Sequence, residues 1–173
     1  MSNFKKLLNQ VRAFAFDVDG VFTDGQVYLQ AGQEFVRAVN IKDGYAVQHC
    51  IKMGFPIAVI SGGRSDEVVK RFQKLGVTDI YMGSSNKWDS YENFRYKYRL
   101  EHKEILYMGD DIPDYHIMKQ TGVPTCPADA VIEIKEVAVY ISDKNGGQGC
   151  VRDVIEQVLR LKDKWMVNES FQW

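Results

Sequence analysis

The sequence has few cysteines, no long apolar run and almost no net charge. Its three cysteines, Cys50, Cys126 and Cys150, are far apart, odd in number and form no CxxC pair, which excludes a disulfide framework. No segment approaches the roughly 20 apolar residues that span a bilayer. A formal net charge of −1 argues against a nucleic acid or an anionic membrane as partner. These absences predict a cytoplasmic protein with buried free thiols, whose ligand is a small molecule.

The 173 residues, 45% of them hydrophobic, predict one domain spanning residues 1–173 with a single sizeable core. Short apolar runs that resemble buried strands alternate with amphipathic runs that resemble helices. The expected strands are 13–18, 56–61, 78–83 and 104–111, and the expected helices are 43–53, 65–75, 88–99 and 112–121. This alternation predicts an α/β fold, a Rossmann-like parallel sheet with helices on both faces.

Two segments depart from the alternation. Residues 25–40 form two alternating runs around Ala31-Gly32, which predicts a β-hairpin inserted after the first strand, and no segment is long enough for a cap domain. Residues 165–173 leave the pattern of the last helix and form a tail with three aromatic residues.

Polar residues follow four of the expected strands. They are Asp17 and Asp19 after the first, Ser61, Gly62, Gly63 and Arg64 after the second, Lys87 beyond the third, and Asp110, Asp111 and Asp114 after the fourth. In a parallel sheet these ends meet at one edge, where ligands bind. Several carboxylates with a hydroxyl and an ammonium group suit Mg²⁺ and a phosphate. One carboxylate could attack phosphorus, and another two residues away could transfer protons.

The motifs FDVDGVFTDG, ISG, Lys87 and GDDIPD, in this order, resemble the haloacid dehalogenase superfamily of phosphohydrolases. NIKDG at 40–44, YMGSSNK and GGQGCVRD make the chain similar to its capless 3-deoxy-D-manno-octulosonate (KDO) 8-phosphate phosphatase family. The resemblance implies a Mg²⁺-dependent homotetramer that supplies KDO for lipopolysaccharide.

The resemblance also implies roles for individual residues. Asp17 would be the nucleophile and Asp19 the general acid/base, and Asp17, the Asp19 carbonyl and Asp110 would hold Mg²⁺, supported by Asp111 and Asp114. Ser61 and Lys87 match phosphate-binding positions. Positions associated with substrate are Asp19, Asn40, Ile41, Lys42, Asp43, Gly44, Gly62, Gly63, Arg64, Arg71 and Lys87, with Arg152 at the tip of a late loop. The sequence departs from many relatives at Ser-Gly-Gly-Arg and at Gln48, which affects the expected sugar contacts more than the chemistry.

Two alternatives stay open, together with the assembly. A nonulosonate 9-phosphate is the nearest rival substrate. A receiver-like signalling domain also uses an aspartate, a lysine and an acidic pair, although its phosphoacceptor follows the third strand, and TDIYMG carries no aspartate at its end. Because there is no cap domain to shield the active site from water, we expect a neighbouring subunit to provide that side of the site. The apolar hairpin positions Val27, Leu29, Phe35 and Val39 therefore predict a tetramer with active sites shared between subunits.

Overall fold

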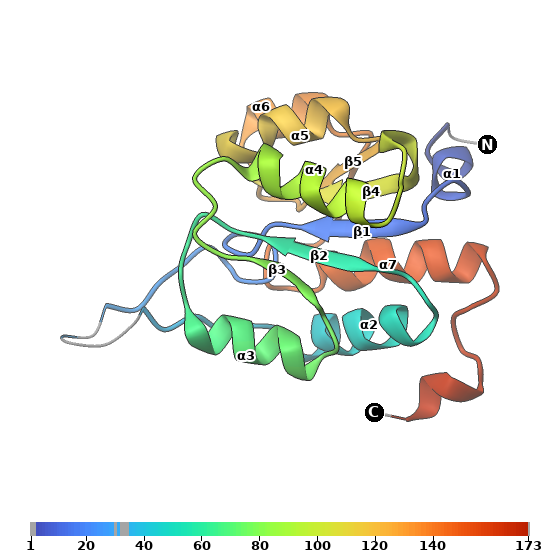
Figure 1. Cartoon of the computed structure of the whole chain (residues 1–173), viewed down its shortest axis with the longest axis horizontal. Helices are drawn as coiled ribbons and strands as arrows, with labels where there is room; N and C mark the ends of the chain where they lie inside the picture. Colours follow the sequence, from blue (N-terminus) through green and yellow to red (C-terminus); the bar gives the residue numbers. More distant parts are fainter. Residues whose placement is uncertain (1–2, 30, 32–34, 173) are drawn as a thin grey trace.

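The computed structural model describes residues 3–29, 31 and 35–172. Its centre is a six-stranded parallel sheet in the order β3-β2-β1-β4-β5-β6 (Figure 1). The strands are β1 (Ala13–Phe16), β2 (Ile57–Ile60), β3 (Asp79–Tyr81), β4 (Ile105–Met108), β5 (Val123–Cys126) and β6 (Tyr140–Ile141). This is the Rossmann order. The chain first adds β2 and β3 on one side of β1 and then returns to add β4, β5 and β6 on the other side. A receiver domain has the order 2-1-3-4-5, so the topology excludes that alternative.

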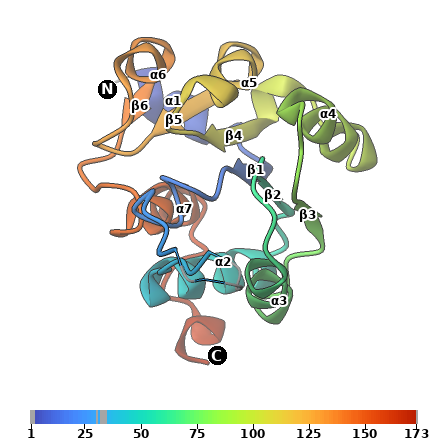
Figure 2. The same ribbon diagram turned by 90° about the vertical axis from the view of Figure 1, so that its left-hand side faces the viewer.

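Helices cover both faces of the sheet, as expected (Figure 2). One face carries α2 (Ile41–Lys52), α3 (Asp66–Lys74) and α7 (Cys150–Leu161), and the other carries α4 (Lys87–Lys97), α5 (Tyr115–Gln120) and α6 (Ile132–Val137). The remaining helices are α1 (Asn3–Leu8) and the 3₁₀ turns η1 (His102–Glu104), η2 (Ile112–Asp114) and η3 (Asn168–Phe171). No helix among the described residues is long and apolar enough to cross a membrane.

The core has two layers because successive side chains of a strand point to opposite faces. In β1, Phe14 and Phe16 pack with the side of α2, α3 and α7, whereas Ala13 and Ala15 pack with Tyr91 and the other helices. All three cysteines are free and buried within these layers, as predicted.

The four strands and four helices expected from the sequence are confirmed, with boundaries shifted by a few residues. Strands β5 and β6 were not predicted. Pro124 interrupts β5 with a residue that cannot donate to a ladder, and β6 has only two residues. Gly54 and Gly76 follow α2 and α3 with a positive φ, whereas Gly122 after α5 has none.

The described residues 25–29, 31 and 35–40 extend away from the carboxyl ends of the strands (Figure 1). Tyr28 and Val36 form one antiparallel bridge, in which each backbone N–H donates to the other's carbonyl at 3.1 and 3.3 Å. Part of the predicted hairpin, including Gly32, lies outside the described residues. The bridge sets the two arms of the segment side by side and brings residues 35–40 back toward the sheet.

The C-terminal tail folds onto its own chain, on the side of α2 that faces away from the sheet (Figure 2). Trp165 is buried, and its ring lies edge-on to Tyr45 and His49 at 6.0 and 5.4 Å. The His49 ring nitrogen Nε2 lies 2.9 Å from the Lys164 carbonyl and 3.2 Å from the Ser170 hydroxyl. The described part of the tail is thus built into the core at α2 and does not cover the strand ends.

Candidate active site

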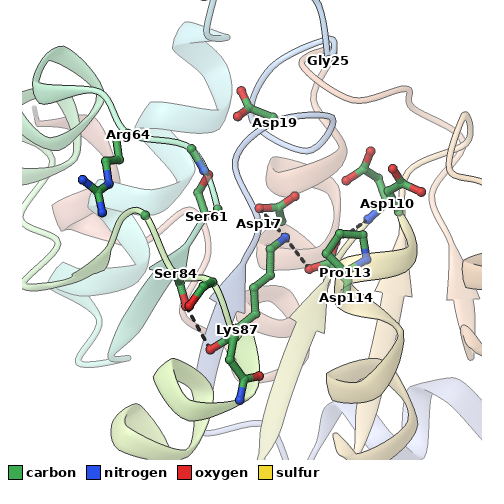
Figure 3. Close-up of a pocket in the computed structure, with 16 residues that line it drawn as sticks. Asp17, Asp19, Gly25, Ser61, Arg64, Ser84, Lys87, Asp110, Pro113 and Asp114 are labelled. Carbon is green, nitrogen blue, oxygen red and sulfur yellow. Dashed lines mark hydrogen bonds and ion pairs between the residues drawn. The ribbon is translucent and has the colours of Figure 1, made fainter.

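A cavity of about 750 Å³ opens at the carboxyl ends of the strands, between β2, β1 and β4 (Figure 3). Ten of the predicted site residues line it: Asp17, Asp19, Ser61, Gly62, Gly63, Arg64, Lys87, Asp110, Asp111 and Asp114. Loop residues 83–86, which belong to the YMGSSNK motif, complete the wall. The side chains converge because each one follows a parallel strand and all the strands end at the same edge of the sheet.

Lys87 links two carboxylates at the floor of the cavity. Its ammonium group lies 2.9 Å from Asp17 Oδ1 and 2.7 Å from Asp114 Oδ1, and the Tyr107 hydroxyl donates to the same Asp114 oxygen at 2.6 Å. Burial alone would lower the pKa of Lys87, but the charges of Asp114 and Asp17 raise it above its usual value. Lys87 is therefore a fixed cation beside Asp17, where a phosphate would meet that carboxylate.

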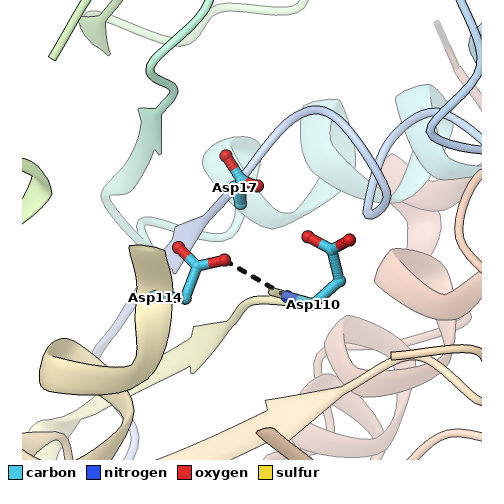
Figure 4. Close-up of side chains that lie close together, drawn as sticks. All are labelled: Asp17, Asp110 and Asp114. Carbon is cyan, nitrogen blue, oxygen red and sulfur yellow. Dashed lines mark hydrogen bonds between the residues drawn. The ribbon is translucent and has the colours of Figure 1, made fainter. Parts of the chain in front are cut away.

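Asp17, Asp110 and Asp114 form the most crowded acidic group of the site (Figure 4). One oxygen from each lies within 4.8 Å of the others. Burial, followed by the charge of Asp114, raises the pKa of Asp17 well above its usual range and that of Asp110 to about 7. The cluster is thus short of positive charge, although Lys87 is present.

The oxygens that lack partners indicate where a cation fits. Both Asp114 oxygens are engaged, Oδ1 with Lys87 and Tyr107 and Oδ2 with the Asp110 backbone N–H at 3.2 Å. Among the residues that the structure describes, the buried atom Asp110 Oδ1 has no hydrogen-bond partner. Oxygen ligands with room for water suit Mg²⁺. The donor set therefore fits a magnesium ion between Asp17 and Asp110, with Asp114 orienting the cluster.

The loop after β1 lies close against Asp110. Gly20 has φ +89°, and a Cβ at this position would lie 2.0 Å from Asp110 Oδ2. Thr23 Oγ1 accepts hydrogen bonds from the backbone N–H groups of Gly20 and Gly25, both at 3.2 Å. Gly20, in the first DG pair of the motif, thus gives the backbone a turn that only glycine adopts readily. Its lack of a side chain leaves room for the Asp110 carboxylate.

Ser61 and Arg64 form the wall on the β2 side. The buried Ser61 hydroxyl accepts from the Gly63 backbone N–H at 3.0 Å, so its own proton can be donated into the cavity. Arg64 lies against Gly83, where a Cβ would stand 2.5 Å from its Nε. In Figure 3 its guanidinium group lies apart from Asp17 and Lys87. The phosphate-binding role predicted for Ser61 is sterically open, and Arg64 lies at the rim.

The remaining predicted substrate positions, Asn40, Ile41, Lys42, Asp43, Gly44 and Arg71, do not line this cavity. The Asn40 side chain caps α2 and donates to the Gly147 carbonyl at 3.2 Å. Asp43 is fully buried and accepts from the Arg152 backbone N–H at 2.7 Å, at the start of α7. Substrate contact by these residues stays a prediction, while their observed contacts join α2 to α7.

Arg152, predicted at the tip of the late loop, also lies outside the cavity wall. Its guanidinium group lies over the Trp165 ring at 5.3 Å, and its Nε donates to Glu156 at 3.1 Å. The loop before it does reach the site from behind, because the Gly147 backbone N–H donates to the Val21 carbonyl at 2.9 Å. The GGQG segment thus supports the loop that follows Asp19.

Arg37 is a contact of the site that the sequence did not indicate. Its Nε donates to Asp19 Oδ1 at 2.6 Å and its Nη2 to Asp19 Oδ2 at 3.3 Å. The arginine side chain is only 9% exposed, whereas that of Asp19 is 34% exposed. An arginine of the segment 25–40 therefore holds the second aspartate of the DxD motif.

Comparison with known proteins agrees with this arrangement. Residues 66–155 match the family model of haloacid dehalogenase-like hydrolases. The KDO 8-phosphate phosphatase of Yersinia pestis is 33% identical over 154 residues, which cover 89% of this chain and 82% of that protein. Its crystal structure superposes with a TM-score of 0.90 over 93% of this chain and 87% of that one. A Moraxella catarrhalis enzyme of the same name, crystallised with magnesium, phosphate and KDO, has 28% identity, covers 95% of each chain and gives a TM-score of 0.91.

Proposed function

The chain belongs to the haloacid dehalogenase-like hydrolases, and on that basis we propose that it is a magnesium-dependent phosphatase of KDO 8-phosphate. The observation that carries the proposal is the pair of the buried Asp17 and the half-buried Asp110, whose Oδ1 has no hydrogen-bond partner among the described residues, beside the fixed ammonium group of Lys87. This arrangement needs a divalent cation and attracts a phosphate. The choice of a sugar-acid phosphate as substrate follows from the names of the similar proteins.

In the first half of the reaction, an Asp17 carboxylate oxygen attacks phosphorus, and the bond between phosphorus and the sugar oxygen breaks. Asp19 gives its proton to the leaving sugar alkoxide, so that the free sugar departs as an alcohol. Lys87 and the Ser61 hydroxyl hold phosphoryl oxygens while charge moves from the nucleophile to the leaving group.

In the second half, water attacks the phosphorus of the aspartyl-phosphate, and Asp19 takes the proton that the water loses. The Asp17 carboxylate is restored and inorganic phosphate leaves. Asp17, Asp110 and the Asp19 backbone carbonyl would hold Mg²⁺, which neutralises the crowded carboxylates and the phosphate. Asp114 keeps Lys87 and the Asp110 backbone in place through its two engaged oxygens.

The proposal is tested by measuring phosphate release from KDO 8-phosphate by the full chain, with Mg²⁺ and with excess EDTA. We expect turnover that requires Mg²⁺ and that is lost in a folded Asp17→Asn variant. A nonulosonate 9-phosphate, assayed in parallel, should give the lower kcat/KM. Activity in excess EDTA or in the Asp17→Asn variant would contradict the mechanism. A higher kcat/KM for the nonulosonate 9-phosphate would identify that compound, rather than KDO 8-phosphate, as the substrate.

We further propose that the enzyme is a homotetramer in which a neighbour walls the site, and that it works in the cytoplasm to supply KDO for lipopolysaccharide. No separate cap lies over the cavity in the described part of the chain. Apolar side chains of the segment 25–40 are exposed, with Leu29 at 77% and Tyr28 at 61%, and a ribbon with such side chains favours packing against copies of itself. Light scattering at micromolar concentration measures the mass, and a fully active monomer would refute the shared site.

A further inference from the structure

We propose that Arg37 determines substrate selectivity by holding Asp19 until the carboxylate of a sugar-acid substrate takes its place. The inference rests on the phosphatase function proposed above and adds a residue to which no role has been assigned. It makes the segment 25–40 part of the chemistry of its own chain, because Asp19 is the group that must move protons in both half-reactions.

The geometry of the pair engages the whole Asp19 carboxylate. The guanidinium group donates to both Asp19 oxygens, at 2.6 and 3.3 Å, so the carboxylate has to turn out of this fork before it can face a leaving group. In Figure 3 the Asp19 carboxylate points away from Asp17 and Lys87. The structure thus shows Asp19 at the wall of the cavity, with both of its oxygens held by Arg37.

Arg37 itself lies between two cavities. The site cavity is lined by Asp19, and an apolar cavity of about 300 Å³ is lined by Arg37 with Arg71, Ser65, Phe72 and other residues of α3 and the segment 25–40. The Arg37–Asp19 ion pair joins the two. Nη2 of Arg37 also stands 3.3 Å from the position of a Cβ on Gly63, so the guanidinium group already borders the glycine loop of the site.

A carboxylate-bearing substrate can therefore release Asp19 in a way that a neutral sugar phosphate cannot. Arginine binds a carboxylate through two parallel N–H donors, so the carboxylate of the sugar acid competes for the same fork that holds Asp19. Once released, the Asp19 carboxylate is free to turn toward the leaving sugar oxygen. A sugar phosphate that has no carboxylate leaves the Arg37–Asp19 pair intact and reacts without Asp19 as general acid.

The test compares KDO 8-phosphate with a hexose 6-phosphate, which has the same type of primary alkoxide leaving group but no carboxylate. The variants are Arg37→Met, which keeps the length of the side chain, and Arg37→Gln as a second replacement, both assayed as full chains with saturating Mg²⁺. The control is Arg12→Met, because Arg12 is 63% exposed and pairs with Glu104 away from the cavity. The quantity measured is kcat/KM, which covers the steps up to the first phosphoryl transfer.

For both Arg37 variants we expect kcat/KM for KDO 8-phosphate to fall by about tenfold or more, the lower range for loss of a charge-assisted pair. At the same time kcat/KM for the hexose 6-phosphate should rise, because Asp19 is no longer held. Arg12→Met should keep the wild-type ratio of kcat/KM for KDO 8-phosphate to kcat/KM for the hexose 6-phosphate. A parallel fall on both substrates, or no change on either, would overturn the proposal. A wild-type chain inactive on every phosphate ester would instead refute the phosphatase function itself.

Discussion

The buried carboxylate of Asp43 makes a prediction about the pH dependence of stability. Asp43 is fully buried and accepts the Arg152 backbone N–H with one oxygen, while its other oxygen has no hydrogen-bond partner in the described part of the chain. Burial raises its pKa from 3.8 to about 6 in the folded protein, against the opposing effect of the backbone donors of Arg152 and Gly149. The folded state therefore holds a proton at pH values where the unfolded chain has released it.

The sign and size of the effect follow from linkage. Because the folded pKa is the higher one, this group's contribution to stability is fully present below pH 3.8 and is lost as the pH rises through about 6. A difference of about two pKa units corresponds to roughly 2–3 kcal/mol. Asp43→Asn keeps an oxygen acceptor for Arg152 but does not titrate. Relative to this variant, the wild type should thus lose roughly 2–3 kcal/mol between pH 4 and pH 7.

The assay is urea unfolding of the wild type, of Asp43→Asn and of the control Asp143→Asn at four or five pH values between 4 and 7. Asp143 is 75% exposed and pairs with Lys144 at the surface, so its variant should follow the wild type. The difference in unfolding free energy between the wild type and Asp43→Asn should change steadily across this range. If the two curves run parallel, the Asp43 carboxyl does not titrate as its burial requires, and the reasoning is refuted.

Three further predictions concern the site and the tail. Asp110→Ala should raise the Mg²⁺ concentration for half-maximal phosphate release by more than about tenfold, because it removes the carboxylate with the unpartnered oxygen. Lys87→Ala leaves the buried carboxylates of Asp17 and Asp114 without their cation, so in the absence of metal it should lower the unfolding free energy by about 3–5 kcal/mol. Added Mg²⁺ should restore part of this stability, measured as a rise in Tm. Trp165→Ala should cost about 3 kcal/mol in urea unfolding while kcat at low temperature is kept, because Trp165 is buried against α2 and does not line the cavity; a loss of kcat with unchanged stability would contradict this.

The sequence allowed most of the sheet to be predicted because β1, β2 and β4 are short apolar runs that end in polar residues. These local signals also placed the nucleophile candidate, the glycine loop and the acidic pair at one edge. Strand β5 was missed because Pro124 resembles an interruption of an apolar run. Local patterns thus sufficed wherever one element carried the whole signal.

The contacts that could not be predicted join segments far apart in the chain. Asp43 and Arg152 belong to two motifs that the sequence marks as functional, and the structure shows that they meet at the start of α7. A motif pattern cannot tell whether a residue touches the substrate or supports the loop that does. Arg37 had even less signal, since a single arginine in an alternating run reads as a solvent-exposed charge. Only the return of residues 35–40 toward the sheet brings its guanidinium group within 2.6 Å of Asp19, and this long-range closure is what makes it part of the site.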